Sequence, residues 1–520
     1  MKKLTYLIIS VFAVCACSME PELTGSYSEK VAWSSEANAQ MYVNDFYPLL
    51  GYNYYNTAVS DDCCSDIMRN NSPMAEENYF LYGTVTVSPD NNIFNNWAWG
   101  HSWALSVCRF IDSMNRYGTG LSQDYRNYLE AQVRWFRAHV YFEMAKRYGA
   151  SLVLWRELPE MGSKNHDRCT PQQCWDFIAE DLDFAAKYLP VSDQAGKLTK
   201  GAALGLKARA MLYARDYESA LNATEQIEEL GIYDLEPDYA KLFQYTRAKG
   251  TSVESIAEFG FSYPSISYTF DKFFCPPGDG GYAQASPTED LVGMYQMADG
   301  RDFDWNDPIM ASSPYEGREY RFYASILYDG ATWKGRVLDM SEGALDGVSA
   351  AGGSTSTGYY MRKLFDPSQT VGFSESDLTY YYMRYAEVLL IRAEALAQLN
   401  RVDEAMVFLN RVRTRAKFDN PLSASSKSEF MALLQRECAV EFAFEGHRFW
   451  DLRRWGIAKQ KLNNYRRKGV KPSVKDGKRQ YTIFSADNKI IKYNDKYNRF
   501  PIPLVEIQRN ESLEQFEEWK

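Results

Sequence analysis

The stretch KARAMLYARDYESAL at Lys207–Leu221 recurs in outline further along the chain as RAEALAQLNRVDEAM at Arg392–Met406. Both stretches have alanine at their second and fourteenth positions and align without a gap. Each combines an apolar helical segment, a short polar turn, and a second segment that begins with an aromatic or branched residue. Because the turn and the alanines fall at the same places, we interpret the two stretches as copies of one helix–turn–helix unit.

This unit has the layout of a tetratricopeptide repeat, in which small alanine side chains allow paired helices to pack closely. Other segments also have helical spacing. Arg134–Tyr148 ends at a glycine, Gln173–Tyr188 follows a cap at Thr170 and Pro171, and Ser428–Phe444 comes after the second unit. The sequence therefore predicts a mostly α fold in which about four helix pairs form a curved scaffold.

The segment from residue 251 to residue 377 interrupts this scaffold. It is rich in Gly, Ser, Asp and aromatic residues, and Phe322–Tyr328 is a candidate strand. Arg467–Arg499 is a second loop-rich segment. Irregular insertions on a rigid frame often contain binding residues. We predict a leader at 1–16, an N-terminal helical region at 17–250, the insertion at 251–377 and a C-terminal helical region at 378–520.

The first residues, MKKLTYLIISVFAVCACSMEPE, have the pattern of a bacterial export signal. Two lysines precede the apolar run Leu4–Val14, which is too short to span a bilayer. Ala16 then precedes Cys17, as cleavage and lipidation at a cysteine require, whereas bulky Val14 makes Cys15 a poorer candidate. We predict a lipoprotein anchored through Cys17; ordinary secretion with cleavage nearby is the alternative.

Composition narrows the classes of function. A net charge of −10 argues against nucleic acid as a partner, and 15% aromatic residues suit a surface that stacks on flat ligands. We find no phosphate-binding glycine loop, no Gly-x-Ser-x-Gly motif and no His-Glu-x-x-His motif, and the four histidines are scattered. The sequence therefore predicts no enzyme activity, no cofactor and no metal.

Seven cysteines follow Cys17, an odd number at scattered spacings that does not resemble a disulfide framework. Cys169 and Cys174 flank a predicted helix start, where a disulfide remains open. For the adjacent Cys63 and Cys64 we favour buried free thiols over a strained bridge.

Several segments, spread over nearly the whole chain, together resemble the SusD/RagB family of outer-membrane nutrient-binding lipoproteins. Besides the lipidation signal, the matching segments are Val133–Phe142, Arg147–Gly149, Tyr359–Lys363, Met383–Ala395, Glu441–Gly456 and Phe500–Pro503. The most specific is EFAFEGHRFWDLRRWG at Glu441–Gly456. Each motif alone is weak, but their order over this length makes the resemblance strong.

The segment Glu441–Gly456 combines core-forming and charged residues. Its apolar positions predicted to enter the core are Phe442, Phe444, Phe449, Leu452 and Trp455. Its charges are too many for one buried face unless they are paired: Glu445, Arg448, Asp451, Arg453 and Arg454. We expect an internal network of arginines and carboxylates, and we prefer it to a catalytic cluster of Glu441, Glu445, His447 and Asp451.

The resemblance implies a shallow ligand site with an aromatic platform. Relatives place a tryptophan and an asparagine near the loop equivalent to Asn91–Gly100, which suggests Asn96 with Trp97 or Trp99, at least one of these tryptophans being core. The insertion offers Tyr282 and Trp333. Trp333 follows a turn and is the aromatic most expected to be exposed, with packing in the core as the alternative. Arg69 is a weaker candidate, near a loop that contacts ligand in relatives. The acidic stretch Asp299–Asp307 lacks calcium-loop spacing, and we favour a solvated turn.

The resemblance further implies a non-catalytic role in glycan uptake. We expect a surface-exposed outer-membrane lipoprotein that binds an oligosaccharide and delivers it to a SusC-like TonB-dependent transporter. Acidic Glu20 and Glu22 resemble the surface-export signal of such lipoproteins. The alternatives are a tetratricopeptide scaffold that binds peptide or protein, and a glycoside hydrolase with two carboxylates beside the aromatic patch.

Overall fold

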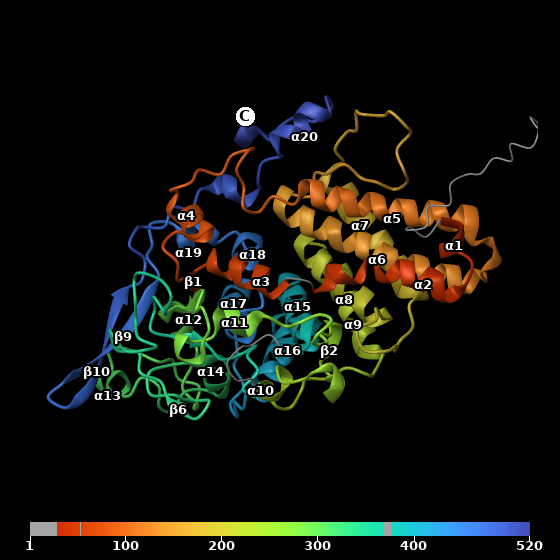
Figure 1. Cartoon of the computed structure of the whole chain (residues 1–520). Helices are drawn as coiled ribbons and strands as arrows, with labels where there is room; N and C mark the ends of the chain where they lie inside the picture. The colour runs from red at the N-terminus through yellow and green to blue at the C-terminus, as the bar shows by residue number, and fades with distance from the viewer. Residues whose placement is uncertain (1–28, 52–53, 369–375) are drawn as a thin grey trace, which may run out of the picture.

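The computed structural model describes residues 29–51, 54–368 and 376–520. The predicted leader and Cys17 lie outside the described residues, so the lipid anchor stays a prediction. Among the described helices, none combines the length and apolar character needed to cross a bilayer. Long helices fill one side of the molecule, and short elements with long loops fill the other (Figure 1).

The long helices form the scaffold that the repeat predicts. They are α5 (Trp97–Tyr117), α6 (Gln123–Tyr148), α7 (Pro171–Tyr188), α8 (Lys200–Ala214), α9 (Tyr217–Glu229), α15 (Tyr385–Gln398), α16 (Val402–Arg415) and α17 (Lys427–Glu441). Each packs on the next in this order, so the helices on either side of the insertion, α9 and α15, are neighbours. The mostly α fold is thus confirmed, while the division into four repeat pairs stays a prediction.

The two repeat units have the same turn. Arg215 between α8 and α9 and Asn400 between α15 and α16 both adopt a left-handed backbone with φ of 63°. In each unit the next N–H donates back to the carbonyl five residues earlier, at Met211 in one and Leu396 in the other. This pattern terminates the first helix of each unit and redirects the chain.

Local signals also set other helix ends. Gly149, with φ of 70°, ends α6 as predicted. Thr170 caps α7, and Pro171 is its first residue. The predicted helix to Phe444 was too long, because α17 ends at Glu441 and the chain turns through Phe444, where φ is also 70°.

The remaining helices are short. They are α1 (Glu29–Ala32), α2 (Glu36–Asn44), α3 (Tyr54–Cys63), α4 (Glu76–Tyr82), α10 (Tyr239–Leu242), α11 (Phe270–Phe274), α12 (Glu289–Val292), α13 (Pro308–Ser312), α14 (Tyr320–Ser325), α18 (Arg448–Arg454), α19 (Ala458–Leu462) and α20 (Leu504–Arg509). The strand predicted at Phe322–Tyr328 is wrong for most of its length, because α14 occupies its first half.

The strands form two-stranded antiparallel pairs. These are β1 (Met68–Asn70) with β3 (Ala285–Pro287), β2 (Ser255–Phe259) with β8 (Tyr380–Arg384), β4 (Ile326–Leu327) with β7 (Tyr360–Met361), β5 (Thr332–Trp333) with β6 (Arg336–Val337), and β9 (Lys468–Lys475) with β10 (Lys478–Ser485). Because β2 and β8 pair, the two ends of the insertion lie together. The hairpin β9–β10 projects from the molecule within a segment predicted only as loop (Figure 1).

An ionic network lies where the Glu441–Gly456 segment enters the core. Glu441 accepts hydrogen bonds from Arg384 at 2.6 Å and Arg321 at 3.0 Å, and also from Arg415. Glu445 pairs with Lys363 at 2.6 Å. The network therefore ties α17 to β8, α14 and α16.

The other charges of this segment are paired with one exception. Arg448 binds Asp66 at 2.8 Å, and Arg454 binds Asp451 at 2.9 Å and also Glu394. Arg453 instead donates to backbone carbonyls, including that of Lys146 at 3.0 Å. The predicted core phenylalanines and Leu452 are buried, whereas Trp455 is only half-buried.

The network makes folding sensitive to acid. Burial alone would raise the pKa of Glu445, but Arg384 and Lys363 outweigh it and lower the pKa to about 2. A lowered carboxyl pKa contributes stability above the unfolded value of about 4.5, which is lost as pH falls toward 2. That contribution is about 3 kcal/mol. We predict that Glu445→Gln shows a shallower loss of unfolding free energy between pH 5 and pH 2 in urea titrations; equal slopes for variant and wild type would contradict this.

Candidate functional site

The first turn of α5 separates the two candidate tryptophans. Trp97 is 2% exposed and packs edge-on against Tyr148. Trp99, two residues on and therefore on another face of the helix, is 40% exposed. Of the two alternatives, Trp97 is the core residue and Trp99 is free to meet a ligand.

Trp99 lines an open groove of about 370 Å³, which we call the tryptophan groove. Its lining residues are Pro48, Leu49, Thr57, Asn96, Trp99, Trp103, His139, Glu143 and Arg147. Trp99 and Trp103 are four residues apart on α5, and His139, Glu143 and Arg147 are spaced by four on α6, so each set shares one helix face. The groove thus has an aromatic wall on α5 opposite charged and polar groups on α6.

The polar side of the groove has a defined charge state. Glu143 accepts from Lys146 at 2.8 Å and Arg147 at 2.7 Å, and these cations lower its pKa despite burial. Burial lowers the pKa of His139 to about 4, so its ring is neutral at pH 7. The ring is fixed by a 2.9 Å hydrogen bond with the Tyr382 hydroxyl.

Two polar atoms of the groove residues lack a hydrogen-bond partner within the described part of the chain. One is Nε of Arg147 and the other is Oδ1 of Asn96. Asn96 precedes α5, yet its side chain does not cap the helix; the neighbouring Asn95 accepts the Trp97 N–H instead, at 3.1 Å. Both atoms are themselves buried, so neither lies on the open face of the groove. The exposed indole beside polar side chains from α6 suits a hydroxylated ligand.

Tyr282 lines a second open groove, of about 390 Å³, which we call the tyrosine groove. Its ring is 51% exposed, and the lining residues are mostly polar: Asn70, Asn71, Ser72, Ala75, Glu76, Glu77, Tyr282, Ala283, Gln284 and Gly353. An adjoining hollow of about 250 Å³ shares Asn70, Glu77 and Gln284 with it and also reaches Ser60.

Helix α3 connects the two regions. Thr57 lines the tryptophan groove, while Ser60, one helical turn further on, lines the hollow beside the tyrosine groove. Figure 1 shows α3 between the long helices and the loop-rich side of the molecule. The tryptophan groove and the hollow beside the tyrosine groove therefore lie about one helical turn apart along α3.

Two predicted ligand residues are buried. For Trp333 the expected exposure was wrong and the core alternative holds, and the weaker candidate Arg69 is buried as well. Trp333 is 4% exposed, because its indole N–H donates to Asp279 at 2.8 Å and its ring turns toward Phe365. Arg69 is 3% exposed and donates to Asp487 at 3.1 Å and to Ser356 at 2.6 Å. Both side chains connect segments far apart in the sequence, which explains why local patterns misplaced them.

The acidic turn Asp299–Asp307 has protein partners for its carboxylates. Asp299 pairs with Arg301, Asp302 with Arg436, and Asp307 caps α13. Within residues 29–51, 54–368 and 376–520, no group of three or more His, Cys, Asp or Glu is arranged to hold a metal.

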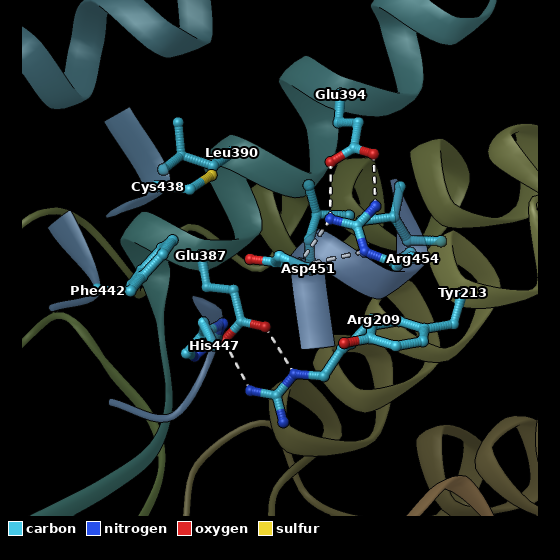
Figure 2. Close-up of a pocket in the computed structure, with 12 residues that line it drawn as sticks. Arg209, Tyr213, Glu387, Leu390, Glu394, Cys438, Phe442, His447, Asp451 and Arg454 are labelled. Carbon is cyan, nitrogen blue, oxygen red and sulfur yellow. Dashed lines mark hydrogen bonds and ion pairs between the residues drawn. The ribbon is translucent and has the colours of Figure 1, made fainter. Parts of the chain in front are cut away.

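A smaller cavity of about 40 Å³ lies beside His447 and Asp451, two residues of the catalytic alternative. Figure 2 shows its charged side chains already paired, Glu387 with Arg209 and Glu394 with Arg454. Its volume admits a few water molecules and not a sugar ring. This arrangement favours a structural role for the cluster.

Sequence reasoning missed most of the tryptophan groove. Trp103, His139, Glu143 and Arg147 were not proposed, although their four-residue spacing was readable. What the spacing could not show is that these faces of α5 and α6 meet η1 (Tyr47–Leu50) and α3 around an open space.

The fold and its open grooves define a class of protein: a mostly helical scaffold with open grooves on its surface. The chain belongs to the SusD family, whose model matches residues 243–519.

Relatives support this over nearly the full length. A SusD-like protein from Bacteroides ovatus is 22% identical over 96% of this chain and 91% of its own. A SusD-like protein from Bacteroides fragilis superposes with a TM-score of 0.80 at 28% identity, covering 93% of this chain and 97% of that one. A SusD-like carbohydrate-binding protein from the same species superposes with a TM-score of 0.82 at 23% identity, covering 93% and 99%.

Proposed function

We propose that this chain is a non-catalytic glycan-binding lipoprotein of the cell surface. The observation that carries the proposal is Trp99, 40% exposed over a groove that Asn96, Glu143 and Arg147 also line. A sugar ring has an apolar face that stacks on an indole and hydroxyls that need such partners. That a relative of the same fold is described as carbohydrate-binding supports this choice.

Isothermal titration of the chain against a panel of oligosaccharides tests the proposal. We expect saturable binding of at least one glycan with modest affinity, because one or two stacked rings leave little beyond the cost of ordering the ligand. Binding of peptides with no binding of any glycan would favour the scaffold alternative. Turnover of a chromogenic glycoside would favour the hydrolase alternative instead.

The proposed role includes delivery of the bound glycan to a transporter. A lipid anchor at Cys17 would hold the grooves beside a SusC-like TonB-dependent transporter in the outer membrane. Co-purification of the two proteins from outer membranes tests this pairing. If the two proteins do not co-purify while glycan binding is intact, the proposed pairing with a transporter is rejected and the binding role stands.

The anchor and the ligand site are expected to act independently. We predict that Cys17→Ala moves the protein from the membrane fraction to the soluble fraction, because one cysteine carries the whole lipid attachment. Its glycan affinity in titration should equal that of the wild type. Lost affinity, or a variant still found in the membrane fraction, would contradict this division.

A further inference from the structure

Cys169 and Cys174 lie on either side of the start of α7. Thr170 between them caps the helix: its hydroxyl accepts the Gln173 N–H at 3.3 Å, and its own N–H donates to the Gln173 side chain at 2.9 Å. The residue before such a cap and the fourth residue of the helix commonly touch as a hydrophobic staple. Here both staple positions are cysteines.

Both thiols are free, and the Cys169 thiol donates to the carbonyl of Ala150 at 3.8 Å. Cys174 is fully buried, whereas Cys169 alone among the described cysteines is partly exposed. The backbone of Cys169 is fixed, since its N–H donates to Leu152 O at 2.8 Å and its carbonyl accepts from the Ser151 hydroxyl at 3.1 Å. The capping box therefore places the two cysteines at the paired staple positions, with the Cys169 thiol partly open to a reagent.

We propose that Cys169 and Cys174 are an oxidation site that forms a disulfide with a disulfide-type oxidant, such as an envelope dithiol–disulfide oxidoreductase. Exported proteins meet such oxidants. The bond would replace a non-covalent staple by a covalent one. The connection between α6 and α7 loops out beside α20 (Figure 1). The disulfide would fix the end of this loop to the first turn of α7.

The chemistry follows from the staple positions of the two thiols. The hydrogen bond from Cys174 lowers the pKa of Cys169 to about 7, so Cys169 is the attacking thiolate near neutral pH. It attacks one sulfur of the oxidant and expels the other as a thiolate. The Cys174 thiol gives its proton to that thiolate and attacks the Cys169 sulfur, releasing the second oxidant sulfur as a thiolate. This thiolate takes up from water the proton that Cys169 released when it ionised. Two protein thiols are oxidised, and one oxidant disulfide is reduced to two thiols.

Tryptic digestion allows the oxidation state of the two cysteines to be measured in a single peptide. Cleavage after Arg168 and Lys187 gives one peptide, CTPQQCWDFIAEDLDFAAK, that contains both cysteines and no other. The full chain is incubated with oxidised glutathione at pH 7.5, denatured with an alkylating reagent, digested and weighed. We expect this peptide to lack alkyl groups and to weigh two hydrogens less than the dithiol, taking two alkyl groups only after reduction.

The peptides of Cys275 and Cys438 are internal controls, since both thiols are buried, and they should be alkylated without reduction. Cys174→Ser should stop the reaction at a glutathione adduct on Cys169. A doubly alkylated peptide from oxidant-treated wild type would overturn the proposal. So would the absence of an adduct on Cys169 in the Cys174→Ser protein. Neither readout depends on the ligand, so the result is separate from the glycan-binding proposal.

Discussion

Glu441→Gln is expected to lower the free energy of unfolding by about 3–5 kcal/mol, the largest loss we predict for a single isosteric change. Glu441 is fully buried and accepts from three arginines: Arg321, Arg384 and Arg415. Glutamine keeps the volume and removes the charge, so these buried guanidinium groups lose a shared counter-ion. Urea denaturation at pH 7 measures the change.

Glu404→Gln is the matched control. Glu404 also pairs with arginine, at 2.7 Å from Arg401, but the pair is on the surface of α16. Solvent screens such a pair, so the control should unfold at the same urea concentration as the wild type. A Glu441→Gln protein that also unfolds there would show that the network does not hold α17 to the scaffold.

Trp99→Ala is expected to raise the Kd for the bound glycan about 10- to 100-fold, or about 1.5–3 kcal/mol. The indole is the exposed aromatic face of the tryptophan groove, and its loss removes the stacking surface while leaving Asn96 and Arg147 in place. Trp99→Phe should lose less affinity, since a smaller ring still stacks. Isothermal titration with the best glycan of the panel measures both.

Tyr117→Ala is the control for Trp99→Ala, because Tyr117 is the last residue of the same helix and is similarly exposed, at 38%. It should leave the Kd unchanged. If Trp99→Ala binds as tightly as wild type while Tyr282→Ala loses affinity, the ligand occupies the tyrosine groove and our choice of groove is wrong. Unchanged affinity in both variants would exclude both grooves.

How far the sequence predicts the site varies from residue to residue. Within the aromatic and asparagine-rich stretch at Asn91–Gly100, Asn96 and Trp99 line one groove, while their contact with a ligand stays a prediction. Tyr282 lines another. Trp333 sits beside its predicted turn, yet the turn leaves the indole pointing inward, toward Asp279. A turn fixes the backbone path, and the exposure of its neighbours depends on what packs above them.

The sequence by itself determined the helical repeat. The turn shared by Arg215 and Asn400, the cap at Thr170 and the stop at Gly149 all depend on residues a few positions apart, so the chain carries them locally. Tertiary structure alone decided which candidates reach solvent. Trp97 is covered by Tyr148, and Arg69 is held by Asp487. Burial is a property of contacts between segments distant in sequence, and no local pattern contains them.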